Sequence, residues 1–570
     1  MAATTHIPLP RTGLTQEQIE GRDAARAREL QSLDKNDTYE RVPISEVSAA
    51  EQRSAIPTSF VDTEKRVSEG ERVYKGRLVA NGNSFFDRRQ NVTTSATTTA
   101  QHSFRIALTI AFAHSGFDPR NIMVADIETA YLTALRSDTV KVIPPKDHPD
   151  HGKFLWRLKR AIYGLGDSGN IFDRSHNKVL VAAGWVPSGI NGLWWKWTGR
   201  PQAARSRLLG LLPTFVDDLA VIPIGTSAEK LIREIAAKGN YTMKITRPKG
   251  GQIRWSGVDF SFAKDSVCIS QIEYLLSLPL PEGQGDPVPA EADVIPLPPS
   301  SREPQQEPAP LLSAADATAF RERLGALSWV ARDTRPDLAE GCNQLSRHAC
   351  APTRPQAEYL LHLLRYARRT VTSRVLQIRR SDIPSLSTPL SLKGWSDASL
   401  GCPGNAHPHT GWLFAIGLAC LHWRSFTQKR VARSSTRAEL YAAHDLVDFL
   451  EHLLPTLRCV WREGVSVTVG VDSGDVLKLV FSEAPRPTER ALQRVVEELQ
   501  LHLLEKSPET LVLHCLAVRD ALDEAAIKLS FVPSEENCAD PFTKPMSIAL
   551  LLPFFTSWPH PSPASCPIVL

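Results

Sequence analysis

The chain has 570 residues, of which 42% are hydrophobic and 22% are charged, and its formal net charge is +4 at pH 7. This length exceeds what one hydrophobic core organises, so two or three domains are expected. The composition excludes an intrinsically disordered chain. The net charge permits a nucleic-acid partner but does not argue for one, because local grooves matter more than the sum.

Cysteine usage and hydropathy suggest where the protein works. Nine cysteines occur without any C-x-x-C pair, which excludes the usual zinc spacing and a secreted disulfide framework and suits a reducing compartment. The N-terminal stretch has no apolar region of the signal-peptide type, and no segment approaches about 20 consecutive apolar residues. We therefore expect an intracellular protein with no membrane partner.

Periodicity predicts the elements of the first half. These are a mostly polar helix over 17–33, a half-exposed strand over 72–80, a buried helix over 99–114, and a strand running into a helical turn over 121–132. The apolar run 208–224 is interrupted at its centre by Val-Asp-Asp, which predicts a β-hairpin with the acids at its tip. Pro213 lies inside this run and favours an edge position or a strand start.

The second half begins after a change in composition. Residues 279–310 are rich in proline and predict an extended or flexible connector. Helical stretches are expected near 314–333 and 336–371. A second compact unit is expected from about Pro389 to Met546, followed by a loose tail.

Three carboxylates of the first half are predicted to converge. Asp126 ends an apolar strand, and Asp217 and Asp218 occupy the hairpin tip. Like charges in an apolar run are costly unless a positive charge compensates them. Carboxylates suit Mg²⁺, and two such ions about 3.5–4 Å apart can activate an attacking hydroxyl and stabilise leaving pyrophosphate. The alternative is that Val-Asp-Asp is only a turn.

The motifs around these acids resemble a known family, the copia-type long-terminal-repeat retrotransposon polyprotein, in its reverse transcriptase–RNase H portion. The matching stretches are DIETAYL at 126–132, FVDD at 215–218, YKGRLVANG at 74–82 and LKRAIYGLGDSG at 158–169. WSGVDF, ISQIEYLLSL and LGALSWVARDTRPDLAEGCNQLSR follow in the expected order. The resemblance extends from about residue 20 to 546.

The resemblance implies roles for the first acidic cluster. Asp126 and Asp217 would be metal ligands and Asp218 the supporting acid, in a site that takes two Mg²⁺ or Mn²⁺ ions.

The resemblance also implies substrate-binding residues. Tyr131 would be a steric gate that excludes a ribose 2′-hydroxyl, although a core aromatic is the alternative. Lys75 and Arg77 would meet the triphosphate, with a solvated strand face as the alternative. Ser168 would belong to the same substrate site.

Some residues depart from the family pattern. Where the family usually has L-K-Q-S-P, this chain has LGDSG at 165–169, so Asp167 replaces a glutamine that would contact the nucleotide. Asp167 adds negative charge near a triphosphate, and Phe215 replaces a tyrosine. Together with Pro213 these changes predict altered catalytic efficiency without loss of a metal ligand.

A second set of acids lies in the C-terminal half. Asp397 is expected on a strand, Glu439 on a helix, Asp472 at a strand end and Asp540 at a helix start. One acid from each of four elements is the pattern of a two-metal nuclease in a mixed sheet, whereas each acid alone is more often a surface group. GWSDASL, SSTRAEL, VDS and ENCADPFTKP resemble the family's RNase H signatures, and no histidine is placed near the leaving group.

Basic residues interleaved with aromatic ones are candidate contacts for phosphates, with plain solvated surface as the alternative. These candidates are Lys153, Arg157, Lys159, Arg160, Arg365, Arg368 and Arg369.

The expected fold class is an α+β right-hand polymerase with fingers, palm and thumb, followed by an α/β RNase H-like domain with a mixed sheet. The expected parts are an N-terminal tail 1–19, fingers and palm 20–278, a proline-rich connector 279–312, thumb-like or connection helices 313–385, an RNase H-like domain 389–546 and a C-terminal tail 547–570.

The resemblance implies an RNA-directed DNA polymerase with RNase H activity. Its partners would be an RNA template, a DNA primer, an RNA–DNA hybrid and dNTPs, in the cytoplasm (within a virus-like particle) or the nucleus; its oligomeric state is open. One alternative is a decayed or domesticated remnant that only binds nucleic acid, and another is a chain that retains only the nuclease. Protease, zinc-knuckle and integrase motifs are missing, so we expect a fragment of a polyprotein or a reading frame that lost those parts.

Overall fold

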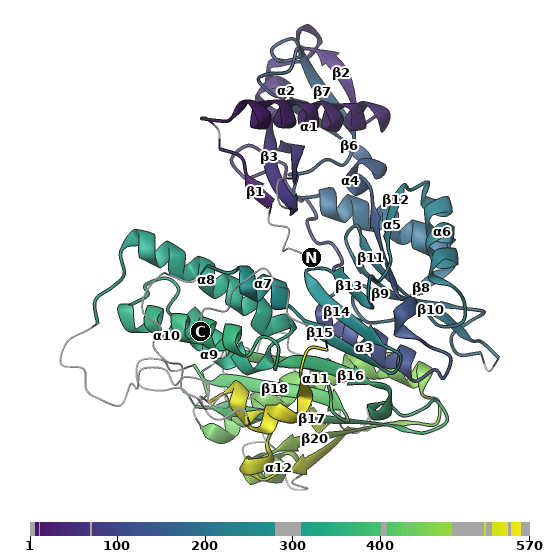
Figure 1. Cartoon of the computed structure of the whole chain (residues 1–570), viewed down its shortest axis with the longest axis vertical. Helices are drawn as coiled ribbons and strands as arrows, with labels where there is room; N and C mark the ends of the chain where they lie inside the picture. Colours follow the sequence, from purple (N-terminus) through teal and green to yellow (C-terminus); the bar gives the residue numbers. More distant parts are fainter. Residues whose placement is uncertain are drawn as a thin grey trace, which may run out of the picture. The chain divides into compact units, whose positions relative to one another are not determined.

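The structure is a computed structural model of the chain (Figure 1). It describes residues 6–10, 12–68, 71–203, 205–279, 309–400, 407–429, 431–432, 434–481, 518–519, 522, 527–544 and 549–559. Most of the predicted connector 279–312 and parts of both predicted tails lie outside the described residues. No helix in the described ranges has both the length and the apolar character needed to cross a bilayer.

The chain divides into two compact units. Unit 1 contains Met1–Ala100 and Asn121–Arg247, and unit 2 contains Gln101–Arg120 and Pro248–Cys566. The units do not follow the predicted boundary between 385 and 389, so the predicted domain boundaries stay predictions.

Unit 1 contains two six-stranded sheets. The first has the order β1-β3-β6-β7-β2, with β4 paired to β3, and the second has the order β12-β5-β11-β10-β9-β8. The strands of the first sheet are β1 (His6–Pro8), β2 (Tyr39–Pro43), β3 (Ile56–Ser68), β4 (Glu71–Ala80), β6 (Leu135–Ile143) and β7 (Phe154–Arg160). Those of the second are β5 (Met123–Ile127), β8 (Trp185–Pro187), β9 (Leu193–Trp197), β10 (Leu208–Phe215), β11 (Asp218–Pro223) and β12 (Met243–Thr246).

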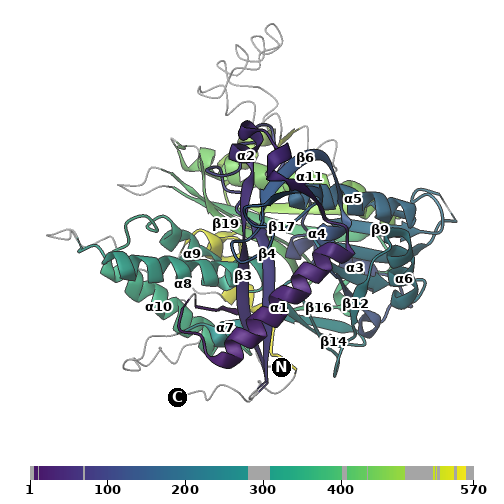
Figure 2. The ribbon, with the colours of Figure 1, turned by 90° about the horizontal axis from the view of Figure 1, so that it is seen from above.

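The helices of unit 1 cover these sheets. They are α1 (Gln16–Lys35), α2 (Ala49–Ser54), α4 (Ala130–Thr133), α5 (Ser168–Ala182) and α6 (Ala228–Gly239). Helix α1 crosses β3 and β4 (Figure 2). The crossing is close at Gly21, where an added Cβ would lie 2.1 Å from the ring of Tyr74, so only glycine fits there.

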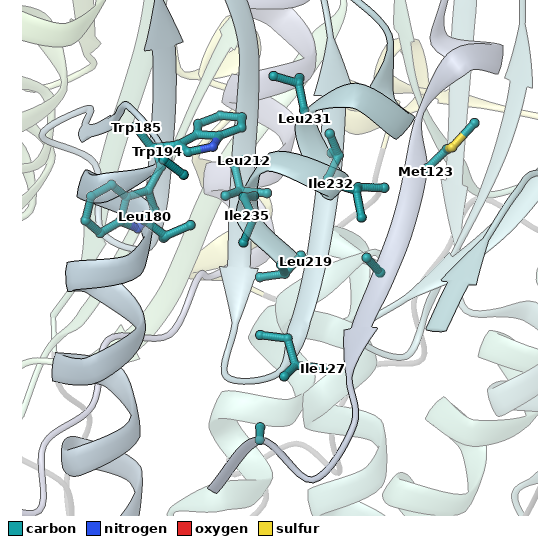
Figure 3. Close-up of a cluster of buried hydrophobic side chains, with 14 of the residues drawn as sticks. Met123, Ile127, Leu180, Trp185, Trp194, Leu212, Leu219, Leu231, Ile232 and Ile235 are labelled. Atoms are coloured by element: carbon teal, nitrogen blue, oxygen red, sulfur yellow. The ribbon is translucent and has the colours of Figure 1, made fainter. Parts of the chain in front are cut away.

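The second sheet of unit 1 is held by an apolar core (Figure 3). Leu231, Ile232 and Ile235 lie on one side of α6, as expected for an amphipathic helix, and pack with Leu212 and Leu219 of the hairpin. The helix begins where the Ser227 Oγ accepts the amide of Lys230, at 3.3 Å. This core fixes the strands that carry the first acidic cluster.

Unit 2 contains two five-stranded sheets and several helices. The sheet orders are β13-β14-β15-β16-β22 and β19-β18-β17-β20-β21. The strands are β13 (Gln252–Trp255), β14 (Val258–Ala263), β15 (Ser266–Ser270), β16 (Val375–Arg379), β17 (Leu390–Ser399), β18 (His409–Ile416), β19 (Ala419–Thr427), β20 (Val465–Val471), β21 (Ile527–Phe531) and β22 (Phe555–Thr556). The helices are α3 (Gln101–Phe112), α7 (Ile272–Ser277), α8 (Ala314–Asp333), α9 (Ala339–Ser346), α10 (Arg354–Arg369), α11 (Ser435–Val460) and α12 (Gly474–Phe481).

The second sheet of unit 2 is mixed, as predicted. Strand β17 pairs antiparallel with β18 and parallel with β20, and β20 pairs parallel with β21. Helix α11 packs on β17, β18 and β20 (Figure 1). Helices and mixed sheets together confirm the α+β character of the chain.

Two local predictions are wrong. Pro213 lies inside β10, between β11 and β9, and not at an edge. It pairs with Leu193, the first residue of β9, so its missing N–H falls where that ladder ends. The expected helix 336–371 is broken into α9 and α10, because Thr353 donates its amide to Gln356 Oε1 at 2.7 Å and caps a new helix.

The core of unit 1 gives a stability prediction. Ile235→Ala removes a fully buried side chain from α6 and should lower the free energy of unfolding of unit 1 by about 3 kcal/mol. Urea unfolding of the full chain measures the change, with the exposed Arg233→Ala on the same helix as control. Equal effects of the two variants would contradict the described core.

Candidate active sites

The hairpin β10–β11 brings the first three acids together. Asp218 is the register partner of Asp126 in the β11–β5 ladder, and the Ile127 amide donates to the Asp217 carbonyl at 3.0 Å. Asp126 therefore lies beside the hairpin tip, as the sequence predicted. The catalytic roles of the three acids stay a prediction.

The tip of the hairpin has an unusual backbone. Val216 has a φ of 56°, in the left-handed region that a β-branched residue rarely adopts. Such strain persists only where the surroundings over-determine it, and it gathers at functional sites. Here it lets the turn connect β10 to β11 with Asp217 and Asp218 placed next to Asp126.

The electrostatics of this cluster favour an added cation. Burial, then the charges of Asp217 and Asp126, raise the pKa of Asp218 to about 6. Burial and the Asp217 charge also raise the pKa of Asp126, and burial raises that of Asp217. Ionising all three acids is therefore costly without a compensating charge, and three carboxylates are a donor set that fits a hard divalent ion.

The predicted triphosphate residues lie on one face of β4. Lys75 and Arg77 are exposed and two positions apart, so their side chains leave the strand on the same side. Lys244, the register partner of Asp126 on β12, and then Lys75 lower the pKa of Asp126, and Arg77 lowers that of Asp217, although burial outweighs these effects. The structure therefore brings both cations near the acids.

Tyr131 lies beside the same cluster of acids. It follows Ala130 at the start of α4, and its ring makes edge contacts with Tyr163 and Phe172 at centroid distances of 5.0 and 6.0 Å. The Arg77 guanidinium lies over the Tyr163 ring at 4.5 Å. Burial and then the charge of Asp217 raise the pKa of Tyr131. The ring is thus held in place by packing while remaining partly exposed.

The structure does not support Ser168 as a substrate contact. Its side chain is buried, and its Oγ donates to the Ile162 carbonyl at 2.6 Å. Ser168 therefore fixes the start of α5.

Asp167 is neutralised by two arginines. It is 7% exposed, and Arg136 and Arg89 pair with it at 2.6 and 2.8 Å. Asp87 and Asp138 bind the same guanidinium groups, at 2.8 Å from Arg89 and 2.9 Å from Arg136. Burial raises the pKa of Asp167, but the hydrogen bonds and the charges of Arg136 and Arg89 together outweigh burial and lower it. The departure from the family glutamine is thus compensated by an ion-pair network that the sequence analysis missed.

Unit 2 gathers the second set of acids. One oxygen each of Asp397, Asp472 and Asp540 lies within 4.8 Å of the others, and no other such group of possible metal ligands occurs among the described residues. The parallel register of β17 and β20 explains why Asp397 and Asp472 lie close together. Trp395 pairs with Gly470, and Asp397 and Asp472 follow two residues further along β17 and after β20.

Glu439 reaches the same place from α11. Its Oε2 accepts the amide of Ala398 at 3.0 Å. Burial, then the charges of Asp397 and Asp472, raise the pKa of Glu439 to about 9. All four predicted acids therefore meet in unit 2, with Glu439 at the margin of the three aspartates.

The fourth element is a short turn that docks on the sheet. The Asn537 side chain donates to the Ser396 carbonyl at 3.2 Å and accepts the Ala539 amide at 3.1 Å, which places Asp540. Asp540 Oδ1 is buried without a hydrogen-bond partner. An orphaned carboxylate oxygen beside two further aspartates fits a divalent-ion site.

Two side chains of this turn were not assigned a role from the sequence. Thr543 Oγ1 donates to Asp397 Oδ2. Lys544 pairs with Asp397 at 3.3 Å and with Asp540 at 3.4 Å. Both residues lie in the FTKP stretch at 542–545, and its resemblance to an RNase H signature was the sequence signal that could have indicated their place at the site.

The predicted nucleic-acid contacts are divided between the units. In unit 1, Arg157 pairs with Glu40, Lys159 pairs with Asp37 at 2.7 Å, and Arg160 donates to the Thr133 carbonyl at 2.9 Å. These intramolecular partners weaken the prediction that the basic residues of β7 contact nucleic acid. The remaining candidates are Lys153, exposed before β7, and Arg365, Arg368 and Arg369 on α10. Of these, Arg368 donates to the Leu276 carbonyl at 2.8 Å.

Comparison with known proteins shows what the chain is similar to. Residues 39–278 match the family model described as reverse transcriptase (RNA-dependent DNA polymerase). The chain is 23% identical over 554 residues to the retrovirus-related Pol polyprotein from transposon RE2 of Arabidopsis thaliana, covering 94% of the chain and 34% of the relative. It is 22% identical over 550 residues to that from transposon RE1, with the same coverage. The resemblance to copia-type retrotransposon Pol polyproteins is confirmed.

Two facts define how far these likenesses extend. The chain spans about a third of the length of these curated relatives. A solved structure of the foamy viral protease-reverse transcriptase in complex with RNA/DNA hybrid covers 94% of this chain and 56% of its own, at 12% identity and a TM-score of 0.46.

The arginine network around Asp167 gives a second prediction. Asp167→Gln restores the family residue but leaves the buried Arg136 charge without this partner, so it should destabilise α5 and β6 by about 3 kcal/mol. Hydrogen exchange of their amides measures the loss. Asp138→Asn, which touches the same arginines from a half-exposed position, should have a smaller effect. Unchanged or increased protection in Asp167→Gln would contradict the compensating role.

Proposed function

We propose that the chain is an RNA-directed DNA polymerase that also degrades the RNA strand of an RNA–DNA hybrid. The polymerase proposal rests on the pairing of Asp126 with Asp218 beside the strained Val216 turn. The match of residues 39–278 to the reverse transcriptase family model supports this reading. In this proposal residues 20–278 act as fingers and palm and residues 313–385 as thumb-like helices.

In the polymerase centre, Asp126 and Asp217 would hold two Mg²⁺ or Mn²⁺ ions, with Asp218 supporting them. When bound, such ions activate the primer hydroxyl and stabilise the departing pyrophosphate. Lys75 and Arg77 would bind the triphosphate of the incoming dNTP, since their shared strand face lies toward these acids.

Tyr131 would select the sugar. Its ring is held by Tyr163 and Phe172, so it cannot easily move aside for a 2′-hydroxyl. A held ring beside the catalytic acids favours deoxynucleotides, and the product would be DNA.

In the nuclease centre, Asp397, Asp472 and Asp540 would hold divalent ions and Glu439 would complete the site. Residues 389–546 would then act as an RNase H-like domain. The substrate would be an RNA–DNA hybrid, because such sites read the 2′-hydroxyl and A-like geometry. The partners are then an RNA template, a DNA primer, their hybrid and dNTPs.

The main observation in favour of a decayed remnant that only binds nucleic acid no longer supports it. It rested on the negative charge of Asp167, and that charge is paired with Arg89 and Arg136.

Primer extension tests the polymerase proposal. The purified chain with Mg²⁺ or Mn²⁺ should extend a DNA primer on an RNA template, and Asp217→Asn should slow extension by about 10³-fold or more, since metal-bound charge stabilisation is worth several kcal/mol. Asp147→Asn, an exposed acid of unit 1, should extend normally. If the wild type extends nothing while Asp217→Asn binds the template–primer equally well, the binding-only alternative is correct.

Hybrid cleavage tests the second centre separately. Glu439→Gln keeps the size of the side chain but removes its charge, so it should abolish cleavage of the RNA strand and leave extension intact. Asp448→Asn, exposed on the same helix, serves as the matched control. Loss of cleavage and extension together would argue against two independent centres.

A further inference from the structure

A lysine side chain reaches into the acidic cluster of unit 2. Lys544 Nζ lies 3.3 Å from Asp397 Oδ2 and 3.4 Å from Asp540 Oδ2. These two acids belong to the group whose carboxylate oxygens lie within 4.8 Å of one another. One positive charge of the protein itself therefore lies where a divalent ion would bind.

The backbone holds Lys544 next to this group. Its amide donates to the Asp540 carbonyl at 3.1 Å, one turn after Asp540. The preceding turn is anchored by Ser425 Oγ, which donates to the Phe542 carbonyl at 2.6 Å. The Lys544 side chain is nevertheless 44% exposed, so it can leave the cluster for solvent without moving the backbone.

The ammonium group and a divalent ion need the same carboxylates. Lys544 takes Oδ2 of Asp397 and Oδ2 of Asp540, and it leaves the buried Asp540 Oδ1 without a hydrogen-bond partner. An ammonium group is a donor with a single charge and cannot bridge three carboxylates as a divalent ion can. The contact with Lys544 therefore neutralises the negative charge of the acids only in part.

We propose that Lys544 is a resident counter-cation of the nuclease centre, which competes with divalent ions for Asp397 and Asp540 and so raises the ion concentration needed to load the site. This inference rests on the proposed nuclease function. It makes Lys544 a positioning residue whose removal tightens ion binding. A purely structural ion pair would have the opposite effect, since its loss would loosen the turn that carries Asp540.

Direct Mn²⁺ binding tests the inference without reference to activity. The full-length chain carries Asp126→Asn and Asp217→Asn, so that the acids of unit 1 contribute little, and free Mn²⁺ is followed by electron paramagnetic resonance. Lys544→Met should bind Mn²⁺ about tenfold more tightly, the effect expected of losing two ion pairs whose ammonium group is partly exposed and whose acids are buried. Lys544→Arg, which keeps the charge, and Lys528→Met, an exposed lysine on β21, should bind like the parent.

The outcomes separate the inference from the proposed function. If the parent binds Mn²⁺, Asp397→Asn loses that binding and Lys544→Met leaves it unchanged or weakens it, the counter-cation role is wrong and the nuclease site stands. If the parent shows no Mn²⁺ binding that depends on Asp397, the nuclease site and the inference both fail. A tenfold lower Mg²⁺ requirement for hybrid cleavage in Lys544→Met would support the role independently.

Discussion

Backbone pairing between strands holds mutually repelling carboxylates together in both units. In unit 1 the β5–β11 ladder sets Asp126 against Asp218. In unit 2 the parallel register of β17 and β20 carries Asp397 and Asp472 to neighbouring positions. The ladders and the cores behind them keep these acids close, and burial first, then the charges of the neighbouring acids, raise the pKa values of Asp218 and Glu439.

The cations around the two clusters differ. In unit 1 Lys244, the register partner of Asp126 on β12, and then Lys75 on β4 lower the pKa of Asp126, and Arg77 on β4 lowers that of Asp217. In unit 2 Lys544 contacts two of the acids directly. The proposed nuclease centre thus holds a lysine in direct contact with its own acid group.

Much of the candidate sites could be predicted because their signals are local. The Val-Asp-Asp interruption predicts a hairpin tip. Asp126 meets this tip as soon as its strand pairs antiparallel with one strand of the hairpin. The position of Pro213 was not predictable, because its place in the sheet depends on the strand order and on the start of β9 at Leu193. The break near Thr353 had a local signal, a cap followed by proline, which periodicity alone obscured.

Long-range partners explain the remaining gaps. Asp167 looked like a defect because Arg89 and Arg136, far from it in sequence, cannot be assigned to it without the fold. The bond from Ser168 Oγ to the Ile162 carbonyl spans only six residues, but it depends on how the loop before α5 folds, which periodicity does not show. Anomalous scattering from crystals of the full chain grown with Mn²⁺ tests the central claim most directly. The account predicts peaks beside Asp126 and Asp217 and among Asp397, Asp472 and Asp540, and the absence of a peak at either cluster would contradict it.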